Sequence, residues 1–74
     1  YSVTYRATCM RDSVDFQALT DRFSTHRLIV NRSALSKSGE HVIFTWKVYG
    51  DPDRHEAAER EFVEDPGIVE FEVV

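Results

Sequence analysis

One stretch, residues 41–49 (His-Val-Ile-Phe-Thr-Trp-Lys-Val-Tyr), constrains the fold more than any other part of the chain. Its strongly apolar residues occupy every second position and are Val42, Phe44, Trp46 and Val48. The alternating set is more polar and consists of Ile43, Thr45, Lys47 and Tyr49. Because successive side chains of a β-strand point to opposite faces, this pattern predicts a strand with one apolar face. The stretch contains the only tryptophan, so we expect it to anchor the core.

Three further strands are predicted from similar patterns. Residues 1–10 alternate cleanly, with an apolar set of Val3, Tyr5, Ala7 and Cys9. Residues 68–74 place Val69, Phe71 and Val73 on one face and Glu70 and Glu72 on the other. Residues 27–35 are ambiguous, since Leu28 and Val30 suit one face and Ile29 and Leu35 suit the other. Such ambiguity is typical of an edge strand, and the turn predicted at residues 36–39 joins it to the central strand.

Two helices are predicted between these strands. The first has Asp12 or Ser13 as its N-cap and extends to about Ser24, with a helical stripe of Phe16, Leu19 and Phe23. The second begins with Asp51 as the N-cap and Pro52 in the first turn, and extends to about Glu64. Its thin apolar stripe contains Ala58 and Phe62, and Glu56 can pair with Arg60 one turn later.

The element order is therefore β-α-β-β-α-β within a single domain of residues 1–74. This order predicts an α+β, ferredoxin-like sandwich, a four-stranded antiparallel sheet with two helices on one face. The right-handed crossover rule places the first and third strands at its centre.

Composition limits the possible functions. The formal net charge is −4, from 13 acidic and 9 basic residues, and the bases are scattered, which argues against nucleic-acid binding. Cys9 is the only cysteine, and no apolar run approaches the ~20 residues that a membrane-spanning helix needs. The start at Tyr1, directly within a strand pattern, leads us to expect a segment of a longer protein. The small core and the edge strands also favour a homodimer.

No catalytic or metal-binding pattern is apparent, so we expect neither an enzyme nor a cofactor. The histidines His26, His41 and His55 have no metal-ligand spacing with a cysteine, an acid or one another. The second helix ends in an acidic run, Glu56, Glu59, Glu61, Glu64 and Asp65, which we interpret as a solvated helix surface. Cys9 lies on the apolar side of its strand, which predicts a buried thiol.

The uncovered face of the sheet is the most informative surface. It is predicted to carry Thr4, Arg6, Thr8, Thr45, Lys47, Glu70 and Glu72. If the first and last strands are neighbours, Arg6 can pair with Glu70 or Glu72. We predict an interaction face that contains Arg6, Ile43, Lys47 and Tyr49.

The sequence resembles the ACT-like C-terminal cytoplasmic domain of the MgtC/SapB family. The resemblance rests on residues 5–9 (Tyr-Arg-Ala-Thr-Cys), the central strand, and residues 64–73 (Glu-Asp-Pro-Gly-Ile-Val-Glu-Phe-Glu-Val). It implies a non-enzymatic regulatory or protein-interaction domain of an inner-membrane protein linked to magnesium transport. The implied location is the cytoplasmic face of the bacterial inner membrane, where this soluble segment would contact its own transmembrane domain, a regulatory protein or a small ligand.

An alternative is an ACT-type sensor of amino acids attached to a metabolic enzyme. Such domains usually have a glycine in the loop after the first strand, whereas this chain has Arg11-Asp12-Ser13 there. Asp12 would also repel a ligand carboxylate from the helix N-terminus, which otherwise attracts anions.

Overall fold

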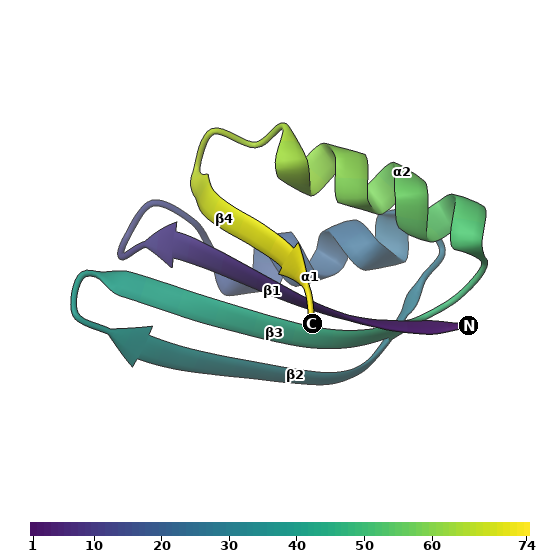
Figure 1. The fold of residues 1–74 in the computed structure, drawn as a ribbon, viewed down its shortest axis with the longest axis horizontal. Helices are drawn as coiled ribbons and strands as arrows, with labels where there is room; N and C mark the ends of the chain where they lie inside the picture. Colours follow the sequence, from purple (N-terminus) through teal and green to yellow (C-terminus); the bar gives the residue numbers. More distant parts are fainter.

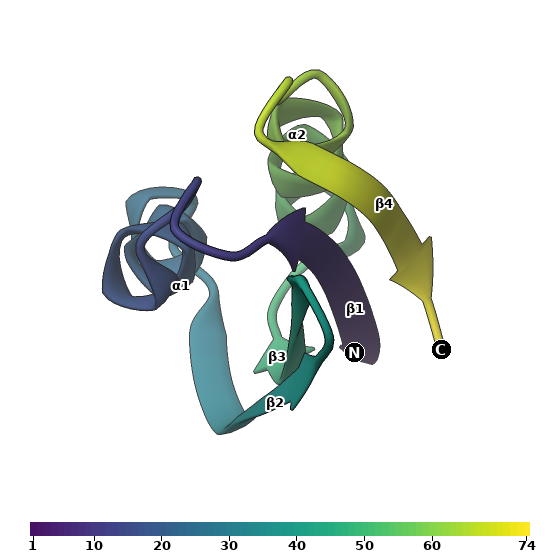
Figure 2. The ribbon, with the colours of Figure 1, turned by 90° about the vertical axis from the view of Figure 1, so that its left-hand side faces the viewer.

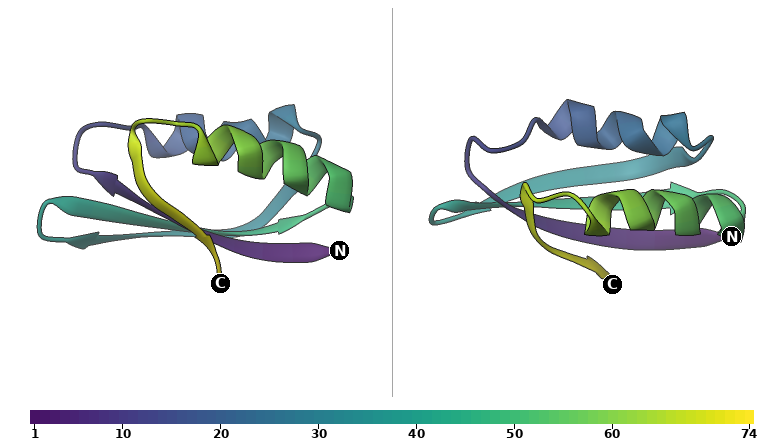
Figure 3. Two further views of the ribbon diagram at one scale, coloured as in Figure 1. Left: turned by 45° about the horizontal axis from the view of Figure 1, so that its top comes forward. Right: turned by 90° about the horizontal axis from the view of Figure 1, so that it is seen from above.

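The computed structural model describes residues 1–74 and has the predicted order of elements (Figure 1). The elements are β1 (Ser2–Met10), α1 (Phe16–Thr25), β2 (Ile29–Ser38), β3 (His41–Tyr49), α2 (Pro52–Val63) and β4 (Ile68–Val73). The strands form one antiparallel sheet in the order β2-β3-β1-β4, so the predicted ferredoxin-like fold and its central pair β1 and β3 are confirmed. Both helices cover the same face of the sheet (Figure 3).

The apolar side of β3 forms the centre of the core, as its alternation predicted. Trp46 has no exposed surface, and its neighbours on this side, Phe44 and Val48, are also buried. The indole Nε1 donates a hydrogen bond of 2.9 Å to Thr20 Oγ1 in α1, which satisfies the one polar atom of the ring. Helix α1 buries Leu19 and Phe23 against this surface, and α2 buries Ala58 and Phe62.

The start of α1 differs from the prediction. Its N-cap is Asp15, whose carboxylate accepts a hydrogen bond of 3.0 Å from the backbone N–H of Gln17, rather than Asp12 or Ser13. Asp12 adopts a left-handed φ of 72°, and Ser13 Oγ donates to the carbonyl of Met10, so both residues belong to the turn that leaves β1. The predicted start of α2 is confirmed, with Asp51 at the N-cap and Pro52 in the first turn.

Strand β2 lies later in the chain than predicted, since it begins at Ile29 instead of Arg27 and ends at Ser38 instead of Leu35. Residues 36–38, which we expected in a turn, pair with the first residues of β3, and the remaining connection is Gly39-Glu40. Gly39 has a φ of 63°, which a tight two-residue connection requires and glycine adopts at low cost. A β-bulge between Val30 and Arg32 resolves the ambiguous register, because it places Leu35 on the same side as Val30, opposite Phe44.

Strand β4 contains a second irregularity. From Glu70 to Val73 the predicted alternation is confirmed by the partners in β1, since Phe71 lies opposite Ala7 and Glu72 lies opposite Arg6. A β-bulge then places Ile68 opposite Cys9 and leaves Val69 without a partner in β1. Val69 is consequently 59% exposed although the pattern assigned it to the covered face.

Candidate functional site: the open face of the sheet

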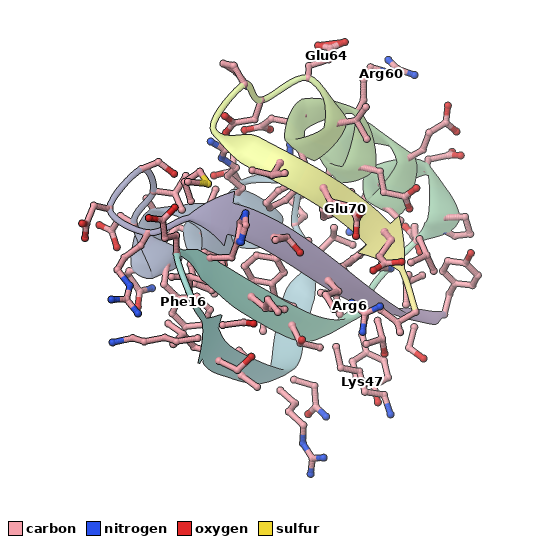
Figure 4. All side chains as sticks on the ribbon, turned by 60° about the vertical axis from the view of Figure 1, so that its left-hand side comes forward. Arg6, Phe16, Lys47, Arg60, Glu64 and Glu70 are labelled. Carbon is pink, nitrogen blue, oxygen red and sulfur yellow. The ribbon has the colours of Figure 1, made fainter.

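The face of the sheet opposite the helices is uncovered and carries the predicted interaction residues. In the β1–β3 pairing Arg6 lies opposite Thr45, Thr8 opposite Ile43, and Thr4 opposite Lys47. These registers place Arg6, Ile43, Lys47 and Tyr49 on one face, and Figure 4 shows Arg6 and Lys47 projecting close together from neighbouring strands. Ile43 and Tyr49 are six residues apart on β3, about 20 Å along a strand, so they do not form one compact patch.

Arg6 forms the ion pair that cross-strand proximity predicted. Its Nη2 and Nε atoms donate to Glu72 Oε1 at 2.6 and 2.9 Å. The two side chains retain 43% and 40% of their exposure, and a half-exposed pair of this kind adds little net stability. The pair instead fixes Arg6 toward β4, at the edge of the face.

The part of the open face formed by β2 and β3 combines cations with aromatic and aliphatic surface. Lys47 Nζ lies 5.8 Å from the centre of the Tyr49 ring, within cation–π range. Ile29 in β2 pairs with Tyr49 and is 70% exposed, and Arg32 pairs with Lys47. We name Ile29, Arg32, Lys47 and Tyr49 the Tyr49 patch. Ile29 and Arg32 were missed in the sequence, because the register of this strand was ambiguous and the β-bulge that precedes Arg32 has no clear sequence signal.

A buried polar network joins β1 to α2 beneath the sheet. Tyr5 Oη lies 2.7 Å from His55 Nδ1 and 2.7 Å from Glu59 Oε2. The single hydroxyl proton of Tyr5 is donated to the Glu59 carboxylate, so the contact with His55 requires Nδ1–H as the donor. This tautomer leaves His55 Nε2 as an acceptor, and that atom is buried without a partner.

Burial controls the protonation of this network. Desolvation raises the pKa of Tyr5 far above its usual value, and the hydrogen bond to Glu59 adds to the effect. Desolvation also lowers the pKa of His55, against the opposing field of Glu59. Sequence analysis missed the burial of His55, although this residue precedes Ala58 and Phe62 by three and seven positions and so continues the apolar stripe of α2.

A second polar cluster joins the two helices. Arg22 Nη2 lies 2.6 Å from Asp65 Oδ2, and His26 Nε2 lies 2.6 Å from Glu61 Oε2. The pKa of Asp65 is lowered by a hydrogen bond from the N–H of Gly67 and by Arg22. The acidic run is therefore more than the solvated surface we expected, since Glu59, Glu61 and Asp65 each bind a specific partner. Glu56 has the predicted partner Arg60, at 3.3 Å.

Two further candidate residues, Cys9 and His41, lie at the same end of the sheet. Cys9 is buried as predicted, and burial raises the pKa of its thiol, which favours the unreactive protonated form. His41 is half-buried at the start of β3, opposite Met10. No group of three or more histidine, cysteine or acidic side chains gathers where it could hold a metal ion.

One groove lies between the start of α1 and the β2–β3 hairpin. It has a volume of about 480 Å³ and is lined on its apolar side by Val14, Phe16, Leu35, Val42 and Phe44. Two bases and two acids complete the lining, namely Arg11, Lys37, Asp12 and Asp15. The groove could hold a small amphipathic molecule, but the two carboxylates beside the helix N-terminus weaken its attraction for an anion.

No helix in the structure is both long enough and apolar enough to cross a bilayer.

Comparison with known proteins identifies the fold. No protein-family model and no curated protein sequence matches the chain. Among solved structures, the C-terminal domain of the MgtC protein from Mycobacterium tuberculosis superposes with a TM-score of 0.77 at 15% identity, over 99% of this chain and 84% of that one. The ACT domain of GTP pyrophosphokinase from Chlorobium tepidum superposes with a TM-score of 0.80 at 9% identity, over 100% of this chain and 97% of that one.

A formyltetrahydrofolate deformylase from Burkholderia mallei contains a similar unit. It superposes with a TM-score of 0.78 at 14% identity, and this chain covers only 28% of the deformylase chain. At identities this low, the likeness concerns the fold. Residues 1–74 therefore have the ACT-like fold that the resemblance to the MgtC/SapB C-terminal domain predicted.

Proposed function

We propose that residues 1–74 form a non-enzymatic regulatory domain of an MgtC/SapB-like inner-membrane protein linked to magnesium homeostasis. The proposal is supported by the backbone likeness to the C-terminal domain of MgtC, together with the sequence resemblance at residues 5–9 and 64–73. The domain would work by binding, through the open face of its sheet, to its own transmembrane domain or to a regulatory protein.

The uncovered sheet face is the observation that carries the binding role. Helices cover only one side of the sheet, so the Tyr49 patch remains in solvent, with Arg6 close to it and Ile43 farther along β3 on the same face. Tyrosine and arginine are enriched in protein interfaces, where a ring with a polar tip contributes large contact area with few rotatable bonds. The cation–π contact between Lys47 and Tyr49 already restrains both side chains, which reduces the entropy lost on binding.

Photo-crosslinking in the full-length protein tests this face. The crosslinking residue benzoylphenylalanine replaces Tyr49 in one variant and Ala18, an exposed residue of α1, in the control. We expect crosslinks to the transmembrane domain or to one defined protein from position 49 and none from position 18. Equal crosslinking from both positions, or none from position 49, would contradict the proposal.

The groove between α1 and the β2–β3 hairpin favours a second candidate, an ACT-type sensor of small molecules attached to a metabolic enzyme. Its apolar floor and its two basic side chains, Arg11 and Lys37, could receive an amino acid. Calorimetry with amino acids and divalent cations distinguishes the two candidates. Saturable amino-acid binding that is lost in Lys37→Ala would replace the first proposal with the second.

We also propose a homodimer formed through β2. This strand is at an edge of the sheet, extends over ten residues and leaves one row of backbone donors and acceptors unpaired. Pairing of two such edges around a two-fold axis would continue the sheet. Sedimentation velocity should detect a dimer that Ala34→Pro abolishes. A monomer at the highest accessible concentration would exclude this arrangement.

A further inference from the structure

Charge is divided unequally along the chain. Residues 51–74 contain nine acidic and two basic residues, whereas residues 1–50 contain four acidic and seven basic residues. The acidic segment folds into α2 and β4, which lie together on the side of the molecule opposite β2 (Figure 2). The two edges of the sheet therefore differ in charge, with β4 on the acidic side and β2 on the basic side.

An apolar groove lies on the acidic side, between the last turn of α2 and β4. Its volume is about 220 Å³, and all of its lining residues are apolar: Phe62, Val63, Ile68, Val69 and Phe71. Val63 and Val69 are exposed by 68% and 59%. The β-bulge in β4 accounts for the exposure of Val69, because it leaves that residue without a partner in β1, whereas Val63 is exposed at the end of α2.

The backbone of β4 is also available. The strand is outermost in the sheet and pairs only with β1, so one row of its N–H and C=O groups has no partner strand. Val73 is 60% exposed on the same side of the strand as Phe71. Apolar surface and free backbone groups thus occur along one edge.

Two carboxylates at this edge have no ion-pair partner. Glu72 is paired with Arg6, and Asp65 with Arg22, but Glu64 and Glu70 form no salt bridge. Arg60 is the nearest base along α2, and its guanidinium pairs with Glu56. Figure 4 shows Glu64 just after the end of α2 and Glu70 on β4. The uncompensated charge at the edge is therefore negative.

We propose that the α2–β4 edge binds an extended polypeptide segment in which apolar and basic residues alternate. The segment would pair with β4 as an additional strand. Its side chains on the helix side would fill the groove of Phe62, Val63 and Val69, and those on the open side would lie opposite Glu70. An acidic rim repels anionic membranes and nucleic acids, so a polypeptide fits the charge pattern better than either. This edge is separate from the Tyr49 patch, and peptide binding there is an addition to the proposed regulatory role.

A pair of peptides tests the proposal on the isolated domain. The probe is acetyl-Lys-Val-Lys-Val-Lys-Val-amide, and the matched control replaces each lysine with glutamate. In a titration followed by amide chemical shifts, the lysine peptide should shift residues 69–73 saturably and more weakly at high salt. The glutamate peptide should produce no saturable shifts. Equal binding of both peptides, absence of binding, or shifts confined to the β2 edge would overturn the proposal.

Two variants, each with one reversed charge, test whether binding depends on the α2–β4 edge. Glu70→Lys should weaken binding of the lysine peptide about tenfold, since it replaces a cross-strand attraction with a repulsion. Glu40→Lys makes the same change of net charge in the β2–β3 turn, which is separated from β4 by β1. The affinity for the lysine peptide should then change by no more than about twofold, because salt screens charges that are farther apart than a Debye length. Equal losses in the two variants would reduce the effect to net charge and refute a specific site.

Sedimentation of the domain alone tests whether a second copy of the chain binds at the β4 edge. Any dimer formed through β2 should persist in Glu70→Lys. Self-association that Glu70→Lys abolishes would assign the β4 edge to another copy of the chain and overturn the proposal.

Discussion

The hydroxyl of Tyr5 offers a sharp test of the buried network. Tyr5→Phe removes one oxygen and keeps the ring, which stacks between Phe23 at 5.7 Å and Phe71 at 5.4 Å between ring centres. No cavity of consequence forms, so any loss of stability reports on hydrogen bonding. The substitution leaves the Nδ1–H of His55 without its acceptor, in a residue that is only 1% exposed and already has an unpaired Nε2.

The expected loss follows from these contacts. A buried donor left without a partner costs about 1–3 kcal/mol, and Glu59, which is partly exposed, can replace its lost bond with water. We therefore expect Tyr5→Phe to lower the free energy of unfolding by about 2 kcal/mol. In a domain of this length that corresponds to a decrease in Tm of about 8–16 °C.

Thermal and urea unfolding at pH 7.5 measure this loss, and a double-mutant cycle isolates its origin. His55→Leu removes both ring nitrogens, so the orphaned donor does not exist in the double variant. Tyr5→Phe combined with His55→Leu should therefore be more stable than the sum of the single effects predicts, by about 1 kcal/mol or more. A Tm for Tyr5→Phe within about 2 °C of the parent, or strict additivity, would refute the hydrogen-bond assignment.

Three further predictions concern the core and the ionisable groups. Trp46→Ala should cost about 3–5 kcal/mol by leaving a cavity under both helices, and unchanged melting in calorimetry would exclude its central position. The lowered pKa of His55 means that the folded state binds fewer protons than the unfolded one below the unfolded value of about 6.5. Stability should thus fall as the pH decreases from 7.5 to 5.5, and the urea midpoint of His55→Leu should show a shallower decrease; an equal slope in both proteins would contradict this. Asp65→Asn should cost about 2 kcal/mol at pH 7, by weakening the bonds from Gly67 and Arg22. The cost should be smaller at pH 2.5, because the stability that comes from the lowered pKa of Asp65 is complete only above the unfolded value of about 3.9 and is lost as the pH falls through the folded value. Equal losses at both pH values would show that the carboxylate charge is unimportant.

The regular parts of the fold could be predicted because their signals are local. The period-2 alternation of residues 41–49 defines a strand with a buried side, and the Asp51-Pro52 pair defines the start of a helix. The irregular parts depend on tertiary pairing. The β-bulges after Val30 and at Val69, and the position of Asp15 as N-cap, are fixed by how each segment meets its neighbour.

Some contacts of the candidate sites could likewise be predicted from the sequence, and others could not. Strand order alone predicted that Arg6 pairs with Glu70 or Glu72, and the register of β1 with β4 selects Glu72. The contact of Tyr5 with His55 joins residues 50 positions apart and depends on the rotation of α2 about its own axis. The apolar stripe of Ala58 and Phe62 indicates which side of α2 is buried, but it does not specify that His55 on that side will meet Tyr5.

The coding sequence that flanks residues 1–74 tests the central claim most directly. A regulatory domain of an MgtC/SapB-like protein predicts, immediately upstream, several apolar segments of about 20 residues, each long enough to cross a bilayer as a helix. A catalytic domain in that position would instead support the sensor attached to a metabolic enzyme. A gene that encodes only this domain would contradict both assignments.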